Sequence, residues 1–176
     1  KNGDFAEGLV NGILSKSKLA KSRGKISNWT LFPNNGDGLV IVEDSSGASD
    51  DGSVILIGNK NNFAGIWQQF DLLTDNYLNI GFNYINYRRN RILDHLLAYD
   101  IVIRLQNDST LNASSSVEIL RKAGKEIKDE KERSYQRFDT SIAYQHDPLL
   151  KYLVVCLQNQ NDSVMSVIGI DNIEMC

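Results

Sequence analysis

The chain has 176 residues, of which 41% are hydrophobic, 23% charged and 9% aromatic. This is enough apolar material for one hydrophobic core, so we predict a single domain over residues 1–176. No apolar run reaches the roughly 18 residues of a membrane-spanning helix. The net charge of −3 gives no electrostatic basis for binding nucleic acid.

Nine short segments have the alternating hydrophobicity and the β-branched or aromatic content of strands. Turn-forming residues separate them, for example Asn34–Gly38 and Asn159–Asp162. In chain order, the predicted strands are residues 39–42, 53–57, 66–72, 77–84, 100–105, 116–120, 135–142, 152–157 and 163–170. Many short strands without intervening helices predict an all-β sandwich or barrel.

Three stretches interrupt this pattern. Residues 9–25 and 86–98 are rich in Lys or Arg, and residues 121–134 form a dense run of alternating charges. We predict that they are solvated loops or short helices inserted between strands.

In four of the predicted strands, the alternation separates inward-facing from outward-facing side chains. Their outward positions carry aromatic, amide and guanidinium groups, and these would line one surface if the four strands shared a sheet. The candidate ligand-binding residues are Trp67, Gln69, Tyr77, Asn79, Asn83, Arg104 and Arg137.

These residue types suit a carbohydrate ligand. An aromatic ring can stack on the apolar face of a sugar, while amides and guanidinium groups hydrogen-bond to its hydroxyls. The set therefore indicates a carbohydrate-binding face. The alternative is an ordinary solvent-facing surface that carries one tryptophan.

Catalytic and transition-metal chemistry have little support in the sequence. His95 and His146 stand apart, without a second ligand at metal-binding spacing. Cys156 lies in an apolar strand, which predicts a buried thiol, and a disulfide with Cys176 stays open. Paired carboxylates occur only in charged, loop-like stretches, so we predict that the chain is not an enzyme.

Several motifs that are weak singly follow one another in a characteristic order. They are Asn2–Gly8 (NGDFAEG), Trp29–Thr30, Asp51–Leu56, Gly65–Leu72, Tyr77–Phe82, Tyr135–Phe138 and Ile168–Met175. The ordered set resembles carbohydrate-binding modules of the galactose-binding-like jelly-roll type, families four, nine and twenty-two, over nearly the whole chain. The resemblance implies a β-sandwich of eight to nine antiparallel strands with neighbouring termini.

The resemblance also implies a structural calcium ion near the termini, bound by the first strand and by the aspartate of the last. Asp171 matches this aspartate, whereas Ala6 replaces the usual glutamate and Glu7 follows one position later. A shift of one residue along a strand turns a side chain to the other face. Asp171 and Glu7 are the candidate ligands, and whether calcium binds stays open.

Two functions are compatible with these observations. The first is a non-catalytic carbohydrate-binding module that recognises a glycan or polysaccharide, secreted or at the cell surface, within a larger protein that has other domains. The alternative is a protein-interaction or assembly domain of a cell-surface, adhesin-like or virion protein on the same fold. The only enzyme-related alternative is an accessory domain of a glycoside hydrolase.

Overall fold

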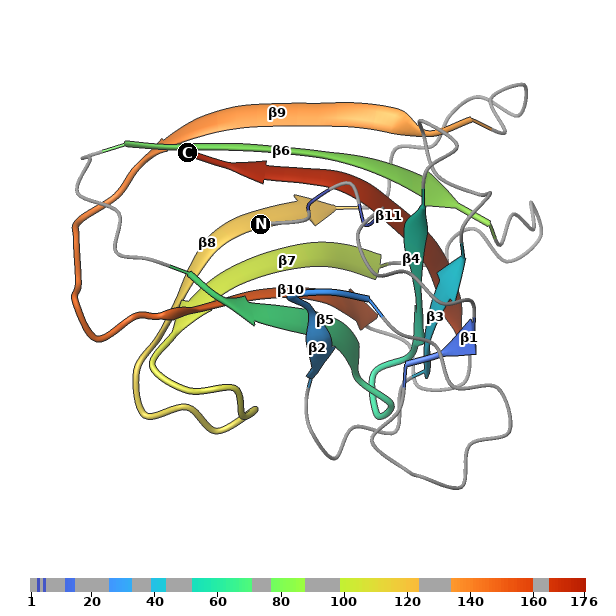
Figure 1. Ribbon diagram of the computed structural model, residues 1–176, viewed down its shortest axis with the longest axis horizontal. Helices are drawn as coiled ribbons and strands as arrows, with labels where there is room; N and C mark the ends of the chain where they lie inside the picture. The colour runs from blue at the N-terminus through green and yellow to red at the C-terminus, as the bar shows by residue number, and fades with distance from the viewer. Residues whose placement is uncertain are drawn as a thin grey trace.

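A computed structural model describes residues 3, 5, 12–14, 26–32, 39–43, 52–70, 77–87, 99–123, 134–159 and 165–176. In these residues eleven strands form two antiparallel sheets, packed as two layers, and no helix occurs (Figure 1). The predicted all-β sandwich is confirmed. The number of strands exceeds the eight to nine expected, because Gly12–Ile13 and Thr30–Phe32 add two short strands to the nine predicted segments.

The six-stranded sheet has the strand order β1-β3-β4-β11-β6-β9. Its members are β1 (Gly12–Ile13), β3 (Leu39–Glu43), β4 (Ser53–Gly58), β11 (Ser166–Met175), β6 (Tyr77–Asn86) and β9 (Gln136–Ala143). In Figure 1, β9, β6 and β11 form the upper layer, and β4, β3 and β1 continue the sheet at the right.

The five-stranded sheet has the order β2-β5-β10-β7-β8 and forms the lower layer in Figure 1. Its members are β2 (Thr30–Phe32), β5 (Ala64–Gln69), β10 (Tyr152–Asn159), β7 (Tyr99–Gln106) and β8 (Ser116–Ala123). No described helix is long and apolar enough to cross a membrane.

The hydrophobic core lies between the two sheets and follows the predicted alternation. The inward-facing side chains of β6 and β7 are all buried: Leu78, Ile80, Phe82, Tyr84, Ile101, Ile103 and Leu105. Each large apolar side chain removed from water stabilises the fold by roughly 1.5–3 kcal/mol. Burial on one phase of each strand therefore leaves the other phase to form the two outer surfaces.

The beginning of the described chain lies beside its last strand. The carbonyl of Gly3 accepts a hydrogen bond of 2.9 Å from the backbone N–H of Ile173. A Cβ atom on Gly3 would lie 1.8 Å from the Ile173 carbonyl oxygen, so this contact requires glycine. Phe5 is fully buried and its ring centroid lies 5.7 Å from that of Trp29. Phe5 thus contributes to the core, and the predicted proximity of the two ends is confirmed at Gly3 and Ile173.

The three predicted insertions fall mostly outside the described residues. Residues 15–25, 88–98 and 124–133 are among those not described, so the insertion prediction stays a prediction there. The described part of the first stretch contains β1, a strand where a short helix or loop was expected. The described part of the third stretch begins inside β8, which extends to Ala123.

Candidate functional site

The seven candidate residues do not line one surface, because their strands belong to different sheets. Trp67, Gln69 and Arg104 lie on β5 and β7 and face outward from the five-stranded sheet. The outer face of the six-stranded sheet carries the rest, which lie on β6 and β9: Tyr77, Asn79, Asn83 and Arg137. The alternation gave the correct side of each strand but not which strands are neighbours.

On the five-stranded sheet, strand pairing brings five outward-facing side chains together around β10. Val154 lies opposite both Trp67 and Arg104, and Tyr152 lies opposite Gln69. Val154 is buried, and the Trp67 and Tyr152 rings meet edge to face with centroids 5.2 Å apart. We call Trp67, Gln69, Arg104, Tyr152 and Val154 the Trp67 face. Tyr152 was missed by the sequence analysis, although it begins a predicted strand on the same phase as Val154.

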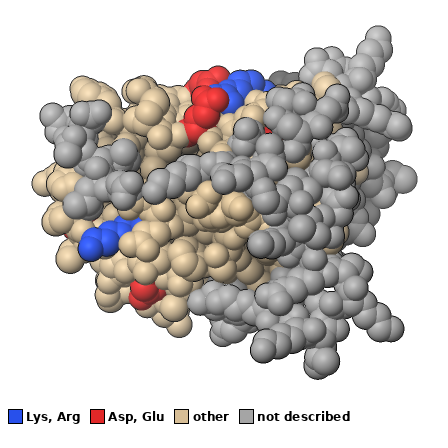
Figure 2. Space-filling view, in the orientation of Figure 1, with Lys and Arg blue, Asp and Glu red and all other residues tan. Residues whose placement is uncertain are grey.

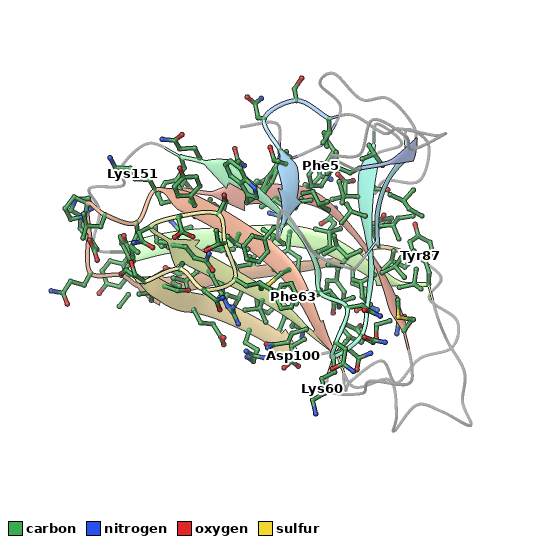
Figure 3. The ribbon with its side chains drawn as sticks, turned by 90° about the horizontal axis from the view of Figure 1, so that it is seen from below. Phe5, Lys60, Phe63, Tyr87, Asp100 and Lys151 are labelled. Atoms are coloured by element: carbon green, nitrogen blue, oxygen red, sulfur yellow. The ribbon has the colours of Figure 1, made fainter. Side chains whose placement is uncertain are left out.

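A small apolar cluster continues the Trp67 face on one side. Phe32, Val102 and Cys156 are buried there together with Val154, and Phe63 packs against them. Figure 3 shows the molecule from below, the side of the five-stranded sheet, with Phe63 and Asp100 labelled. The four buried side chains have no exposed surface, so the outer side of the five-stranded sheet carries a covered apolar cluster next to the Trp67 face.

The predicted buried thiol of Cys156 belongs to this cluster and is confirmed. Its Sγ donates to the Val102 carbonyl oxygen at 3.6 Å, and burial raises the pKa of the thiol to about 12. Both Cys156 and Cys176 are free thiols, so the disulfide left open by the sequence is not formed. A thiol that holds its proton so strongly is a poor nucleophile.

On the β8 side of the Trp67 face, one guanidinium group joins three strands. Arg121 donates to both carboxylate oxygens of Glu118 at 2.7 Å, to Asp100 at 2.6 Å and to the Gln158 amide oxygen at 2.8 Å. The hydrogen bond from Arg121 lowers the pKa of the Glu118 carboxyl, and the pKa of Arg121 itself is raised. Arg121 therefore neutralises both acidic groups beside the Trp67 face.

Arg104 differs from Arg121 in having no such partners. Its half-buried guanidinium makes no hydrogen bond or ion pair with any residue that the structure describes, although Glu118 lies opposite it on β8. The indole Nε1 of Trp67 is also buried without an acceptor. The Trp67 face thus presents aromatic surface and a guanidinium that the described part of the protein does not use, whereas the Trp67 Nε1 is covered by the protein.

Arg137, on the opposite sheet, is fully engaged within the protein. Its guanidinium lies over Gly81 and donates to Asp139 and Glu174 at 2.8 Å and to the Asn172 carbonyl oxygen at 3.1 Å. The hydrogen bond to Asp139 raises the pKa of Arg137. These bonds fix the guanidinium on the sheet surface and leave it little capacity for a ligand.

Asp171 and Asn83 lie side by side on that same sheet and offer oxygen ligands. Asp171 is fully buried, pairs with Asn83 across the strands, and accepts a hydrogen bond of 2.7 Å from the Asn172 backbone. The amide oxygen of Asn83 is buried and has no donor. Carboxylate and amide oxygens are ligands that calcium prefers, so these two residues fit a calcium ion. Glu7 lies outside the described residues, and no three described His, Cys, Asp or Glu side chains form a metal-binding group.

A cleft of about 670 Å³ opens between the edge strands β8 and β9. Apolar side chains and a few polar ones line it, including Val117, Glu118, Ile142, Tyr144, His146 and Pro148. Figure 2 shows that the visible described surface is mostly uncharged, with charged side chains in small groups.

The two packed sheets form a jelly-roll β-sandwich similar to the fold of carbohydrate-binding modules, which confirms the predicted fold. Among solved structures, it superposes on the CBM22-1 xylan-binding domain of Paenibacillus barcinonensis Xyn10C with a TM-score of 0.53, 11% identity and 94% coverage of each chain. Family 16 Carbohydrate Binding Module-2 gives a TM-score of 0.51 at 13% identity, covering 82% of this chain and 89% of that one. The K1 cleaved adhesin domain of Lys-gingipain from Porphyromonas gingivalis W83 gives 0.53 at 10% identity, covering 96% and 97%. No protein-family model and no curated protein matches the chain.

Proposed function

We propose that the chain is a non-catalytic carbohydrate-binding module and that the Trp67 face binds the glycan. The observation that carries this proposal is the pairing of two aromatic rings with the unused donors of Arg104 and Gln69 around buried Val154. Sugar recognition needs an apolar surface together with a few convergent polar groups. The likeness of the fold to carbohydrate-binding modules supports the same function.

The size of the Trp67 face favours an oligosaccharide over a single sugar. Two strands lie between β5 and β8, so three interstrand spacings of about 4.8 Å separate the Trp67 side from Glu118. A polysaccharide segment that crosses the strands would contact the rings first and Arg104 further along. A secreted or cell-surface location, and other domains in the same protein, are the setting that we propose for this function.

Affinity gel electrophoresis on a panel of neutral and acidic polysaccharides tests the proposal. We expect at least one polymer to retard the protein, and Trp67→Ala and Tyr152→Ala to weaken that retardation at least tenfold. Tyr77→Ala is the matched control, because Tyr77 is 63% exposed and lies on the opposite sheet. Retardation by no polymer, or equal retardation of Trp67→Ala and wild type, would contradict the proposal.

An assembly domain is the second candidate, and one observation favours it. Val117 and Leu149 expose 45% and 64% of their surface, and Val117 lines the cleft between β8 and β9. Exposed apolar side chains at a cleft are typical of protein contacts. Size-exclusion chromatography with light scattering distinguishes the candidates: a stable oligomer that Leu149→Ser dissociates, without glycan binding, supports assembly.

We also propose that a structural calcium ion binds at Asp171 and Asn83. The buried carboxylate and the unpartnered amide oxygen support this proposal. The ion would coordinate these two oxygens and so link β6, which carries Asn83, to β11, which carries Asp171.

A further inference from the structure

Near the Trp67 face, the carboxylates already accept hydrogen bonds from the protein, whereas the Arg104 guanidinium donates none to a described residue. This difference indicates the chemistry of the ligand. The nearby carboxylates are occupied: both oxygens of Glu118 accept from Arg121, and Asp100 accepts from the same guanidinium. Arg104 is a cationic donor that has no hydrogen-bond or ion-pair partner among the described residues. The face therefore offers a guanidinium whose neighbouring carboxylate, Glu118, is already paired with another residue.

We propose that the glycan bound at the Trp67 face is acidic and that Arg104 binds its anionic group, a carboxylate or a sulfate. This inference rests on the proposed carbohydrate-binding function. A neutral sugar offers hydroxyls, which donate as well as accept, whereas an anionic group only accepts and so matches a guanidinium, which only donates. The planar fork of an arginine also pairs with an oxyanion through two parallel hydrogen bonds.

The position of Arg104 favours an anionic group over solvent as its partner. The side chain lies between buried Val154 on β10 and Glu118 on β8, with Trp67 on the far side of Val154. A half-buried cation is stabilised by a counter-charge more than an exposed one, because less water screens the pair. The pairing of Glu118 with Arg121 reduces the repulsion that this carboxylate would exert on an incoming anion.

Matched polysaccharides that differ only in charge test the inference. Polygalacturonate and its fully methyl-esterified form share a backbone and test for a carboxylate. Carrageenan and its chemically desulfated form share a backbone and test for a sulfate. We expect wild type to bind one acidic polymer at least tenfold more tightly than its neutral partner in affinity electrophoresis. This preference should fall as salt is added.

Substitutions of Arg104 assign the preference to this residue. Arg104→Gln should remove the preference for the acidic polymer, and Arg104→Lys should retain only part of it, because a lysine keeps the charge without the fork. Arg137→Gln is the control, since Arg137 is an outward arginine on the other sheet. Urea unfolding of each variant confirms that it is folded.

The outcomes separate this inference from the proposed function. Equal binding of acidic and neutral partners that Trp67→Ala abolishes would overturn the inference and leave the carbohydrate-binding function standing. An acidic preference that Arg104→Gln leaves intact would also overturn it. If the protein binds none of the four polymers, the inference is overturned. The panel of neutral and acidic polysaccharides described under the proposed function then tests whether the protein binds any glycan.

Discussion

At the scale of single residues, Cys156 shows how burial sets proton affinity. Burial raises the pKa of its thiol from 9.0 to about 12, while the unfolded chain keeps an ordinary value. The unfolded state therefore loses the proton first as the pH rises, which favours unfolding. The stability that the protonated thiol contributes is complete below pH 9 and is lost between about pH 9 and pH 12.

We predict that the free energy of unfolding declines above pH 9, with Cys156 contributing up to about 1.4 kcal/mol per pH unit. Cys156→Ala should make this decline shallower, whatever its effect at neutral pH. Urea unfolding between pH 8 and about pH 11 measures the slope. Cys176→Ser, at an exposed thiol, should keep the wild-type slope. Identical slopes in all three proteins would show that Cys156 does not titrate in this way.

Gly169 is a second residue whose surroundings dictate its identity. A Cβ atom there would lie 2.6 Å from the Tyr135 hydroxyl and 2.8 Å from side-chain atoms of Ile85 and Tyr87. We predict that Gly169→Ala lowers the free energy of unfolding by about 1–3 kcal/mol, because three packed side chains must move. Ser141→Ala, at an exposed position of β9, should change it by less than about 0.5 kcal/mol. Chemical denaturation of both variants decides this.

At the scale of elements, Arg121 adds side-chain links from β8 to β7 and β10 to the backbone pairing of β8 with β7. Arg121 is 37% exposed, so its ion pairs stabilise the fold only modestly, by about 1 kcal/mol or less. Its larger effect is electrostatic, because it neutralises Glu118, which lies opposite Arg104, and Asp100, which lies four residues before Arg104 on β7.

We predict that Arg121→Gln weakens binding of an acidic polysaccharide severalfold while the protein stays folded. The two released carboxylates would attract Arg104 and repel the anionic ligand. Affinity electrophoresis on polygalacturonate and carrageenan, with Arg137→Gln as the control, measures the effect. Unchanged binding in Arg121→Gln would show that neutralising Glu118 and Asp100 is irrelevant to recognition.

Nine of the eleven described strands could be predicted from the sequence, whereas β1, β2 and part of the site could not. Alternation is a local property, and it correctly assigned Trp67 and Arg104 to outward positions. The alternation assigns Arg104 and Arg137 alike to outward positions. It cannot show that they lie on different sheets, because sheet membership depends on pairing between distant segments. The engagement of Arg137 by Glu174 could not be predicted either, since the two lie far apart in sequence. Tyr152 was missed because its strand was interpreted only as an apolar one.

At the scale of the whole molecule, Phe5 contributes to the core between the two sheets. Phe5 is fully buried against Trp29, although it lies only a few residues from the beginning of the chain. We predict that Phe5→Ala lowers the free energy of unfolding by about 3–5 kcal/mol, as for a core phenylalanine. Leu149→Ala, at a position 64% exposed, should cost less than about 0.5 kcal/mol. A small effect of Phe5→Ala in chemical denaturation would show that Phe5 contributes little to the stability of the core.

The proposed calcium ion also acts on the stability of the whole molecule. An ion that binds only the folded state raises the unfolding temperature as the concentration of the ion increases. We predict that calcium raises the melting temperature by several degrees relative to a chelator, and that Asp171→Asn removes the difference. Thermal unfolding followed by circular dichroism measures this. Equal melting temperatures of wild type with calcium and with chelator would contradict the proposal.

The placement of Trp67 and Arg137 on opposite outer surfaces has a practical consequence. A tether attached to the six-stranded sheet holds the protein with its Trp67 face directed away from the support. Ser141 is exposed on β9 of that sheet, so a Ser141→Cys variant in which the exposed Cys176 is replaced by serine would couple to a sensor chip in one orientation. Coupling through a cysteine at Gln69, which is exposed on the Trp67 face, would present the molecule the other way round and obstruct the same ligand.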